Sequence, residues 1–273
     1  MTNWFQTQEA KNLFERCIHI EQDAVSCLGQ VLGWGPSKRA IIQGGPQVPS
    51  FTPNNAQALH DVMARFRNEA DQQHCVYAEI RCFDDYSAYR NVLEQAGWQY
   101  QPHYDIYIDV RNTVPDAKMR QIRAAMQQGY TWREATSEAD VQAFYTELKH
   151  LYHTKVHRPL PNVAFFLQAW QQGVTVLVVE RAGTIVGGVL LPVLDTTAYE
   201  WYICGQVMST WAMIDYSRQH GIERIDMMGA GEPNVPYGVR DFKLAMGGEL
   251  HDFGRYRCIL RPMWYQLGSL LMK

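Results

Sequence analysis

The sequence predicts a mixed α/β (α+β) fold in two domains, each built on a mixed, mostly antiparallel sheet flanked by helices. The chain has 273 residues, which exceeds the length of a typical single domain. Its hydrophobic content of 47% and charged content of 19% suit a globular protein with a substantial core. Alternating apolar patterns, which are typical of strands, occur in both halves with helix-forming segments between them.

The first half carries alternating strand and helix patterns that end near Val110. Gly44-Gly45-Pro46 stops one strand pattern, and Gly97 closes a helix pattern. One helix has Asn54 or Asn55 available as its N-cap. The predicted elements are short strands within 15–35, a strand at 39–42, a helix at 55–71, a strand at 75–82, a helix at 86–97 and a long strand or strand pair at 98–110. We therefore assign residues 1–112 to an N-terminal domain.

A polar segment follows, in which residues 113–129 are predicted to form a helix that connects the domains and stops at Gly129. Residues 130–273 form the predicted C-terminal domain, whose first helix has Ser137 as N-cap and acidic residues in its first turn. Its predicted elements are a strand at 131–135, helices at 137–155 and 163–173, strands at 175–183, 184–195 and 197–205, a helix at 209–221, strands at 222–231 and 251–260, and an apolar helix at 262–273.

Charge and cysteine usage argue against several classes of function. The formal net charge of −3 does not suit binding of DNA by the whole molecule, although a local basic groove is compatible with it. The six cysteines stand singly without a C-x-x-C pair, so we expect free thiols and neither a metal site nor disulfides. The first residues lack the regions of a secretory signal, and no apolar stretch approaches the roughly 18 residues of a membrane span. We therefore expect a cytoplasmic protein.

Short motifs follow one another along the chain in a characteristic order. The C-terminal half contains KVHRPLP (155–161), YEWYICG (199–205), DMMGAGEP (226–233), YGVRDFK (237–243), GGEL (247–250) and GRYR (254–257). The N-terminal half adds IIQGGP (41–46), YAEIR (77–81) and GWQYQPHYDIYID (97–109). In this order they resemble the Fem-type (FemAB/FemX-like) aminoacyltransferase family of the GNAT acyltransferase superfamily. The resemblance covers nearly the whole chain and implies two GNAT-like domains, of which the first is degenerate.

The resemblance also implies an activity. The family's characterised members transfer an aminoacyl group from a charged tRNA to an amine on a peptidoglycan (cell-wall) precursor. It thus implies an acyltransferase without a required cofactor, whose donor is aminoacyl-tRNA or acyl-CoA. The implied partners are an anionic envelope precursor or other amine acceptor, and tRNA; the terminal helix adds peripheral contact with a membrane as an expectation.

Two alternatives stay open. One is a CoA-dependent N-acyltransferase acting on a sugar or small amine, and the other is a catalytically silent GNAT-like protein that binds an anionic ligand. The CoA pyrophosphate loop, Q/R-x-x-G-x-G/A, would lie after the strand TAYEWYICG, where only Gln206–Ser209 separate strand and helix. That segment has no glycine, which counts against CoA, although the helix N-terminus could still receive an anion. The chain also lacks the long helical arm linked to tRNA contact in some Fem-type enzymes.

Three residues of YGVRDFK are the predicted catalytic groups. Lys243 matches the lysine of the family's Phe-Lys motif, where a cation could stabilise the oxyanion of acyl transfer; the alternative is a surface lysine. Arg240 offers a planar fork for carboxylate or phosphate, or pairs with Asp241. Tyr237 could donate a proton, or only pack against Pro236.

The predicted substrate-binding residues are spread over both domains. Gly229 and Gly231 follow a strand, and Gly238 begins the YGVRDFK turn, where small residues let a ligand approach the backbone or merely form tight turns. Glu200 and Asp226 are carboxylates in apolar strands, where burial would raise their pKa values. The complete set is Gly229, Gly231, Gly238, Phe242, Glu200, Lys155, Arg158, His103 and Tyr104, the last two in a strand at the expected cleft between domains.

Overall fold

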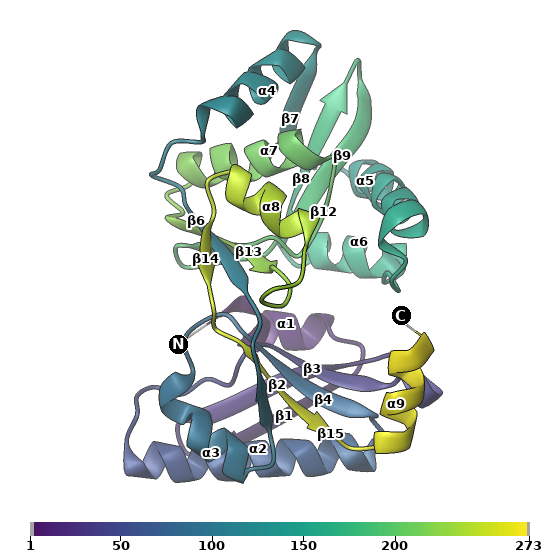
Figure 1. Cartoon of the computed structure of the whole chain (residues 1–273). Helices are drawn as coiled ribbons and strands as arrows, with labels where there is room; N and C mark the ends of the chain where they lie inside the picture. Colours follow the sequence, from purple (N-terminus) through teal and green to yellow (C-terminus); the bar gives the residue numbers. More distant parts are fainter. Residues whose placement is uncertain (1–2, 272–273) are drawn as a thin grey trace. The chain divides into compact units, whose positions relative to one another are not determined.

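The computed structural model describes residues 3–271, and the chain forms two compact units (Figure 1). Unit 1 comprises Met1–Asp105, Gly231–Val235 and Asp252–Lys273, and unit 2 comprises Ile106–Ala230 and Pro236–His251. This division differs from the predicted domains because strands that are far apart in sequence pair in the same sheet. The last strand pairs within the sheet of unit 1, and the predicted connecting helix packs within unit 2.

Unit 1 is built on a six-stranded sheet, sheet A, with the strand order β1-β2-β3-β4-β15-β5. β3 and β4 run parallel, and the other neighbours are antiparallel. The strands are β1 (Cys17–Gln22), β2 (Val25–Leu32), β3 (Arg39–Gly44), β4 (Tyr77–Cys82), β5 (Gln99–Gln101) and β15 (Arg255–Ile259). The helices are α1 (Gln8–Leu13), α2 (Pro53–Gln72), α3 (Arg90–Gln95) and α9 (Pro262–Leu271), with short turns η1 (Trp4–Gln6), η2 (Gly35–Ser37) and η3 (Ser87–Tyr89).

Helix α2 covers one face of sheet A, and α1 lies on the other side of the sheet (Figure 1). Thr52, rather than the expected Asn54 or Asn55, caps α2: its Oγ1 accepts a hydrogen bond from the Asn55 amide, and Pro53 takes the first helical position. The fully buried apolar face of α2, which includes Leu59, Met63 and Phe66, packs into the core of unit 1.

Successive side chains of β4 point to opposite faces of sheet A, so the face toward α2 is apolar and the other face is charged. Ala78 and Ile80 belong to the α2 core, whereas Glu79 and Arg81 form ion pairs on the opposite face. Of the two alternatives for 98–110, a long strand or a strand pair, the structure has the pair. The two strands, β5 and β6 (Asp105–Asp109), belong to different sheets, because Pro102 cannot donate a ladder hydrogen bond and the chain leaves sheet A there.

Unit 2 contains two sheets. Sheet B has the order β10-β11-β13-β6-β14, and sheet C has the order β12-β9-β8-β7. Sheet B consists of β6 (Asp105–Asp109), β10 (Val193–Leu194), β11 (Thr197–Tyr199), β13 (Arg224–Gly229) and β14 (Glu249–His251); sheet C consists of β7 (Tyr130–Glu134), β8 (Thr175–Arg181), β9 (Thr184–Leu191) and β12 (Tyr202–Cys204). The helices are α4 (Asp116–Gln127), α5 (Glu138–Leu151), α6 (Val163–Gln171), α7 (Gln206–Gln219) and α8 (Gly238–Ala245), with the π-helical turn η4 (Tyr152–Val156) after α5.

Helices α5 and α7 pack against opposite faces of sheet C, and two adjacent glycines of β9 allow both to come close. A Cβ on Gly188 would lie 2.9 Å from the Phe144 ring of α5, and one on Gly187 would lie 3.1 Å from Ser209 Oγ of α7. Neither position has room for a larger side chain, so the GG pair of TIVGGVLL is explained by helix packing.

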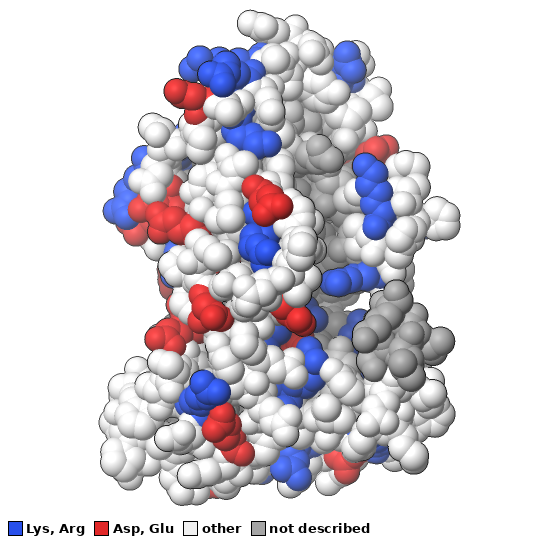
Figure 2. Space-filling model, viewed as in Figure 1, with Lys and Arg blue, Asp and Glu red and all other residues white. Residues whose placement is uncertain are grey.

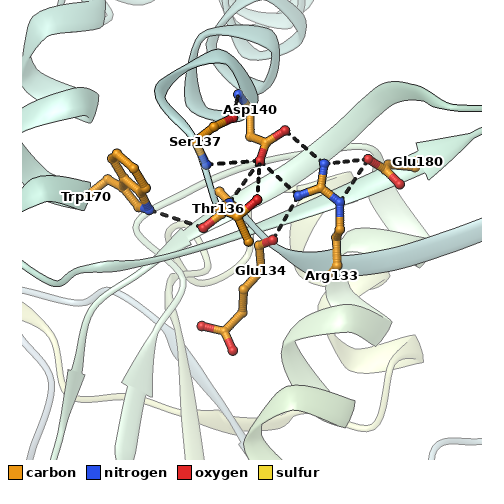
Figure 3. A network of polar contacts seen from close by, with 8 residues as sticks. Arg133, Glu134, Thr136, Ser137, Asp140, Trp170 and Glu180 are labelled. Carbon is orange, nitrogen blue, oxygen red and sulfur yellow. Dashed lines mark hydrogen bonds and ion pairs between the residues drawn. The ribbon is translucent and has the colours of Figure 1, made fainter.

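An ion-pair network joins α5 to the edge of sheet C (Figure 3). Arg133 on β7 donates to both oxygens of Asp140, at 2.8 and 2.9 Å, and to Glu180 of β8 at 2.7 Å. Asp140 also accepts hydrogen bonds from the amides of Thr136 and Ser137, which satisfies donors at the start of α5. The Arg133 guanidinium therefore fixes the helix start to two strands.

Replacing Arg133 with methionine is expected to destabilise the protein by about 1–2 kcal/mol in urea denaturation, a modest figure because solvent screens its 39% exposed side chain. Arg133 lowers the pKa of Asp140, so the stabilisation is present above the ordinary pKa of aspartate and is lost as the pH falls through the lower folded value. Wild type and variant should converge in acid. Arg111→Met is the control: Arg111 is 76% exposed and pairs with Asp109, so its loss should have little effect, and equal losses would contradict this assignment.

Candidate active site

Sheets B and C of unit 2 diverge at Glu200. Its amide donates to the carbonyl of Asp226 in sheet B at 2.8 Å, whereas the next amide, of Trp201, donates to Leu190 in sheet C at 3.2 Å. The strand predicted at 197–205 is therefore divided into β11 and β12. Where two strands separate, backbone groups leave the ladder and need other partners.

Lys243 supplies a hydrogen-bond donor for backbone carbonyls at the end of β13. Its Nζ donates to the carbonyl of Met227 and lies 3.5 Å from the carbonyl of Gly229 and 3.4 Å from Glu200 Oε1. The side chains of Lys243 and Glu200 are only 7% and 6% exposed. The structure thus brings together three predicted site residues, Lys243, Glu200 and Gly229. The alternative of a surface lysine is wrong.

The two charges depend on each other. Burial raises the pKa of Glu200, and the ammonium of Lys243 opposes that effect. A single charge at this depth would be costly, and the pair is tolerated because each ion compensates the other. The expectation that burial raises the pKa of Glu200 is confirmed in direction.

The backbone after the pair is strained. Met228 has a left-handed conformation (φ +62°), which is uncommon for a residue with a long side chain, and its amide donates to Asp226 Oδ1 at 2.7 Å. Gly231 is also left-handed (φ +82°), as a tight turn requires, but it belongs to unit 1. Gly229 therefore adjoins the Lys243 ammonium in an irregular strand end, and Gly231 does not belong to that group.

The start of α8 carries the remaining residues of YGVRDFK. Arg240 is partly buried, and its Nη1 lies 3.4 Å from the carbonyl of Ala230. Tyr237 is 36% exposed at the N-cap position. Gly238 does not have a positive φ, and a Cβ there would meet nothing within 4 Å, so the surrounding space is open to a ligand. Phe242 lies beneath the ammonium of Lys118, 4.9 Å from its ring centre.

Lys155 and Arg158 are exposed on the segment that follows α5. Lys155 belongs to η4, and Arg158 follows a left-handed His157 (φ +51°). Burial raises the pKa of the Tyr152 hydroxyl. Among its neighbours, the Arg158 guanidinium lowers this pKa and the Tyr237 hydroxyl raises it, so both groups are close enough to act on Tyr152. Tyr152, at the start of η4, was not among the predicted site residues.

His103 and Tyr104 lie in the connection between β5 and β6, not in a strand as predicted. They belong to unit 1 and are not part of the Lys243 cluster. His103 contacts the carbonyl of Tyr104 through Nδ1 at 2.8 Å. Burial and the nearby Arg255 lower the pKa of His103 to about 4, so the imidazole is neutral at pH 7.

The connection from β12 to α7 is shorter than predicted. Helix α7 begins at Gln206 and not at Ser209, because Gly205 in the left-handed conformation (φ +90°) makes the whole turn. Gly187 fills the space beside it: a Cβ there would lie 2.8 Å from the Cα of Gly205. Glu147 is close enough to raise the pKa of Cys204, in addition to the larger effect of burial.

Other expectations can be compared directly. All six cysteines are free thiols. Within residues 3–271, no helix combines the length and apolar character that a membrane crossing requires. On the face shown in Figure 2, the described Lys and Arg side chains are interspersed with Asp and Glu.

Solved structures share the fold of this chain. A crystal structure of FemX matches with a TM-score of 0.67 at 13% identity, over 97% of this chain and 94% of that chain. L-PGS from Bacillus licheniformis matches with a TM-score of 0.62 at 14% identity, over 90% and 84%. A GCN5-related N-acetyltransferase from Sphaerobacter thermophilus matches with a TM-score of 0.53 at 14% identity, over 88% and 78%. The predicted fold class, with its GNAT-type architecture, is confirmed.

No protein-family model matches the chain, and no curated protein sequence matches it significantly. At identities of 13–14%, the likeness to the solved structures shows the fold alone.

Proposed function

We propose that the chain is an acyltransferase that joins an aminoacyl group to an amine of a peptidoglycan or other envelope precursor. The observation that carries the proposal is the buried Lys243–Glu200 pair at the point where sheets B and C separate. Its two residues lie in YEWYICG and YGVRDFK, two of the motifs that resemble the Fem-type family, and the fold likeness to FemX supports the same class of chemistry.

The reaction balances without a cofactor. The neutral amine nitrogen attacks the ester carbonyl of the donor, the new C–N bond forms, and the C–O bond to the donor breaks. The proton lost by the amine ends on the departing oxygen, for which the partly exposed Tyr237 hydroxyl is the assigned relay. The tetrahedral intermediate carries a negative oxygen that needs a nearby donor or cation.

Lys243 is the assigned cation. Its three N–H groups are directed at the Met227 carbonyl, the Gly229 carbonyl and Glu200. The contact to Gly229, at 3.5 Å, is the longest of these, and a substrate oxygen would replace it. Arg240, at the same end of β13, is assigned to an anionic group of the substrate.

A CoA-dependent N-acyltransferase is the second candidate, favoured by one observation. Helix α7 has no side-chain cap, so its first amides remain available to an anion such as a pyrophosphate. The likeness to the Sphaerobacter thermophilus N-acetyltransferase supports the same alternative. The single-residue connection at Gly205 argues against it, so we place the aminoacyl donor first.

The donor can be tested directly. Purified protein is incubated with amine-containing envelope precursors and either radiolabelled aminoacyl-tRNA or acetyl-CoA, with and without RNase. We expect transfer from aminoacyl-tRNA that RNase abolishes, and no rise in Tm with acetyl-CoA, since a ligand that binds only the native state would raise it. RNase-resistant transfer from acetyl-CoA would establish the second candidate. Absence of transfer from both donors would instead support a catalytically silent, anion-binding protein.

A further inference from the structure

Unit 1 carries a cluster of charged side chains on the face of sheet A away from α2. Strands β4 and β15 pair with Arg255 opposite Arg81 and with Arg257 opposite Glu79, so the four side chains project from one face. None of these residues was selected from the sequence, although the motifs YAEIR and GRYR contain them.

Glu79 lies at the centre of the cluster. Arg81 Nε donates to its Oε1 at 2.9 Å, Arg257 Nε donates to its Oε2 at 2.9 Å, and Arg255 Nη1 is 3.4 Å from Oε1. The side chain of Glu79 is 2% exposed. Burial alone would raise its pKa, but the three arginines outweigh burial and lower the pKa to about 2. Glu79 is therefore a carboxylate at neutral pH.

The cluster has more positive than negative charge. Beyond Glu79, the other carboxylate that acts on Arg255 is the buried Asp105, so three guanidinium groups face two carboxylates. Burial and the repulsion of Arg81 lower the pKa of Arg255 to about 10. Because the guanidinium groups of Arg81 and Arg255 repel each other at a partly buried position, a further anion beside them would be stabilising.

The three arginines are not equivalent. Arg257 is fully engaged: it binds Glu79 through two nitrogens, donates to the Tyr265 hydroxyl, and lies over the rings of Tyr77 and Tyr265. Arg81 and Arg255 each contact Glu79 through one nitrogen, and their side chains are 33% and 20% exposed. Since a guanidinium carries five N–H donors, most donors of these two residues remain for another acceptor.

The backbone fixes Arg255 in place. Gly254 adopts a left-handed conformation (φ +72°) immediately before β15, and its amide donates to the carbonyl of His103 at 3.0 Å. A Cβ on Gly254 would collide with the Tyr100 ring, so only glycine fits this approach. Arg255 therefore starts its strand at a defined position, beside Arg81.

We propose that Arg81 and Arg255 form a phosphate-binding site on sheet A of unit 1. Two guanidinium forks with unused N–H groups match the oxygens of a phosphate or diphosphate ester, and the excess positive charge favours an anion. The Glu79 carboxylate orients both guanidinium groups, and Arg257 holds the Glu79 carboxylate in place. This site goes beyond the proposed acyl transfer and does not depend on it, because its test measures binding.

The first test is titration calorimetry with inorganic pyrophosphate, with chloride added to hold the ionic strength constant. We expect saturable binding by the wild type and at least tenfold weaker binding by the double variant Arg81→Gln/Arg255→Gln. Arg65→Gln is the matched control: Arg65 is an exposed arginine of α2, so its loss removes the same kind of charge without changing the affinity. Equal affinity in the double variant, or no saturable binding by the wild type, would overturn the proposal.

A measurement on the wild type covers the case in which the double variant does not fold. The Nε–Hε resonances of Arg81 and Arg255 should shift with pyrophosphate in NMR spectra, and that of Arg65 should not. Two further arms identify the source of the phosphate. Competition by a nucleoside diphosphate assigns the site to a soluble ester, and binding to vesicles that contain phosphatidic acid, but not to phosphatidylcholine vesicles, assigns it to a lipid headgroup. If neither ligand binds and acetate displaces pyrophosphate, the site is a carboxylate site and the phosphate assignment fails.

Discussion

Replacing Lys243 with methionine is expected to lower the transfer rate by at least about 100-fold, the usual scale for removing a charge stabiliser from an acyl-transfer site. The side chain remains of similar length, but the end of β13 loses its donor and Glu200 loses its counterion. We expect the unfolding free energy to fall by about 3–5 kcal/mol, because an unpaired carboxylate is left 6% exposed. Transfer kinetics and urea denaturation measure the two effects separately.

A double variant separates the catalytic role of Lys243 from its role in stabilising the fold. Lys243→Met/Glu200→Gln removes both charges, so much of the lost stability should return. The transfer rate should stay low, since the cation is still missing. If the double variant recovers the rate together with the stability, Lys243 only holds the strand end and the catalytic assignment is wrong. Glu200→Gln alone leaves the ammonium in place and serves as the matched single variant.

Replacing Glu79 with alanine is expected to cost about 3–5 kcal/mol of unfolding free energy, the scale measured when one partner of a buried ion pair is removed. Three arginines of sheet A would then repel one another without a central carboxylate. Glu94→Ala is the control, because Glu94 pairs with Arg90 on an exposed surface and should cost less than about 0.5 kcal/mol. Similar losses in the two variants would show that Glu79 does not hold the cluster together.

The same carboxylate predicts a pH dependence. The folded pKa of Glu79, about 2, is below its ordinary value of 4.5, so its stabilisation is fully present above about pH 4.5 and is lost as the pH falls toward 2. The lost amount is about 3 kcal/mol, at 1.36 kcal/mol per pKa unit. Urea midpoints of the wild type should therefore fall toward those of Glu79→Gln over this range. A constant difference between the two proteins down to pH 2 would contradict the assignment.

Much of the fold could be predicted because local patterns determine it. Gly44-Gly45-Pro46 and Gly97 end elements where expected, and Ser137 caps α5 with its capping-box partner Asp140. The division at Glu200 could not be predicted in the same way, nor could the fact that the strands on either side of Pro102 join different sheets. A continuous strand pattern does not record which sheet each half joins, since that choice depends on long-range pairing.

The candidate site was predicted in part. Lys243, Glu200 and Gly229 meet although the first two are 43 positions apart in sequence, and the motifs YGVRDFK, YEWYICG and DMMGAGEP identified them. The burial of Lys243 could not be predicted, because DFKLAM has the pattern of an exposed helix until α8 lies against β13. The arginines of sheet A were missed for a related reason. Arg81 and Arg255 meet only through the pairing of β4 with β15, which the assignment of 252–273 to the C-terminal domain concealed.

The position of β15 between β4 and β5 has a consequence for how the chain is made. On the ribosome, every segment of unit 2 is synthesised before residue 252, whereas sheet A lacks an inner strand until Arg255–Ile259 emerges. Until then β4 has an open edge and β5 has no neighbour in its sheet, although both were made more than 150 residues earlier. The last strand of unit 2, β14, is therefore synthesised before β15 supplies the inner strand of sheet A, so the sheet of unit 1 is completed later than the sheets of unit 2 are synthesised.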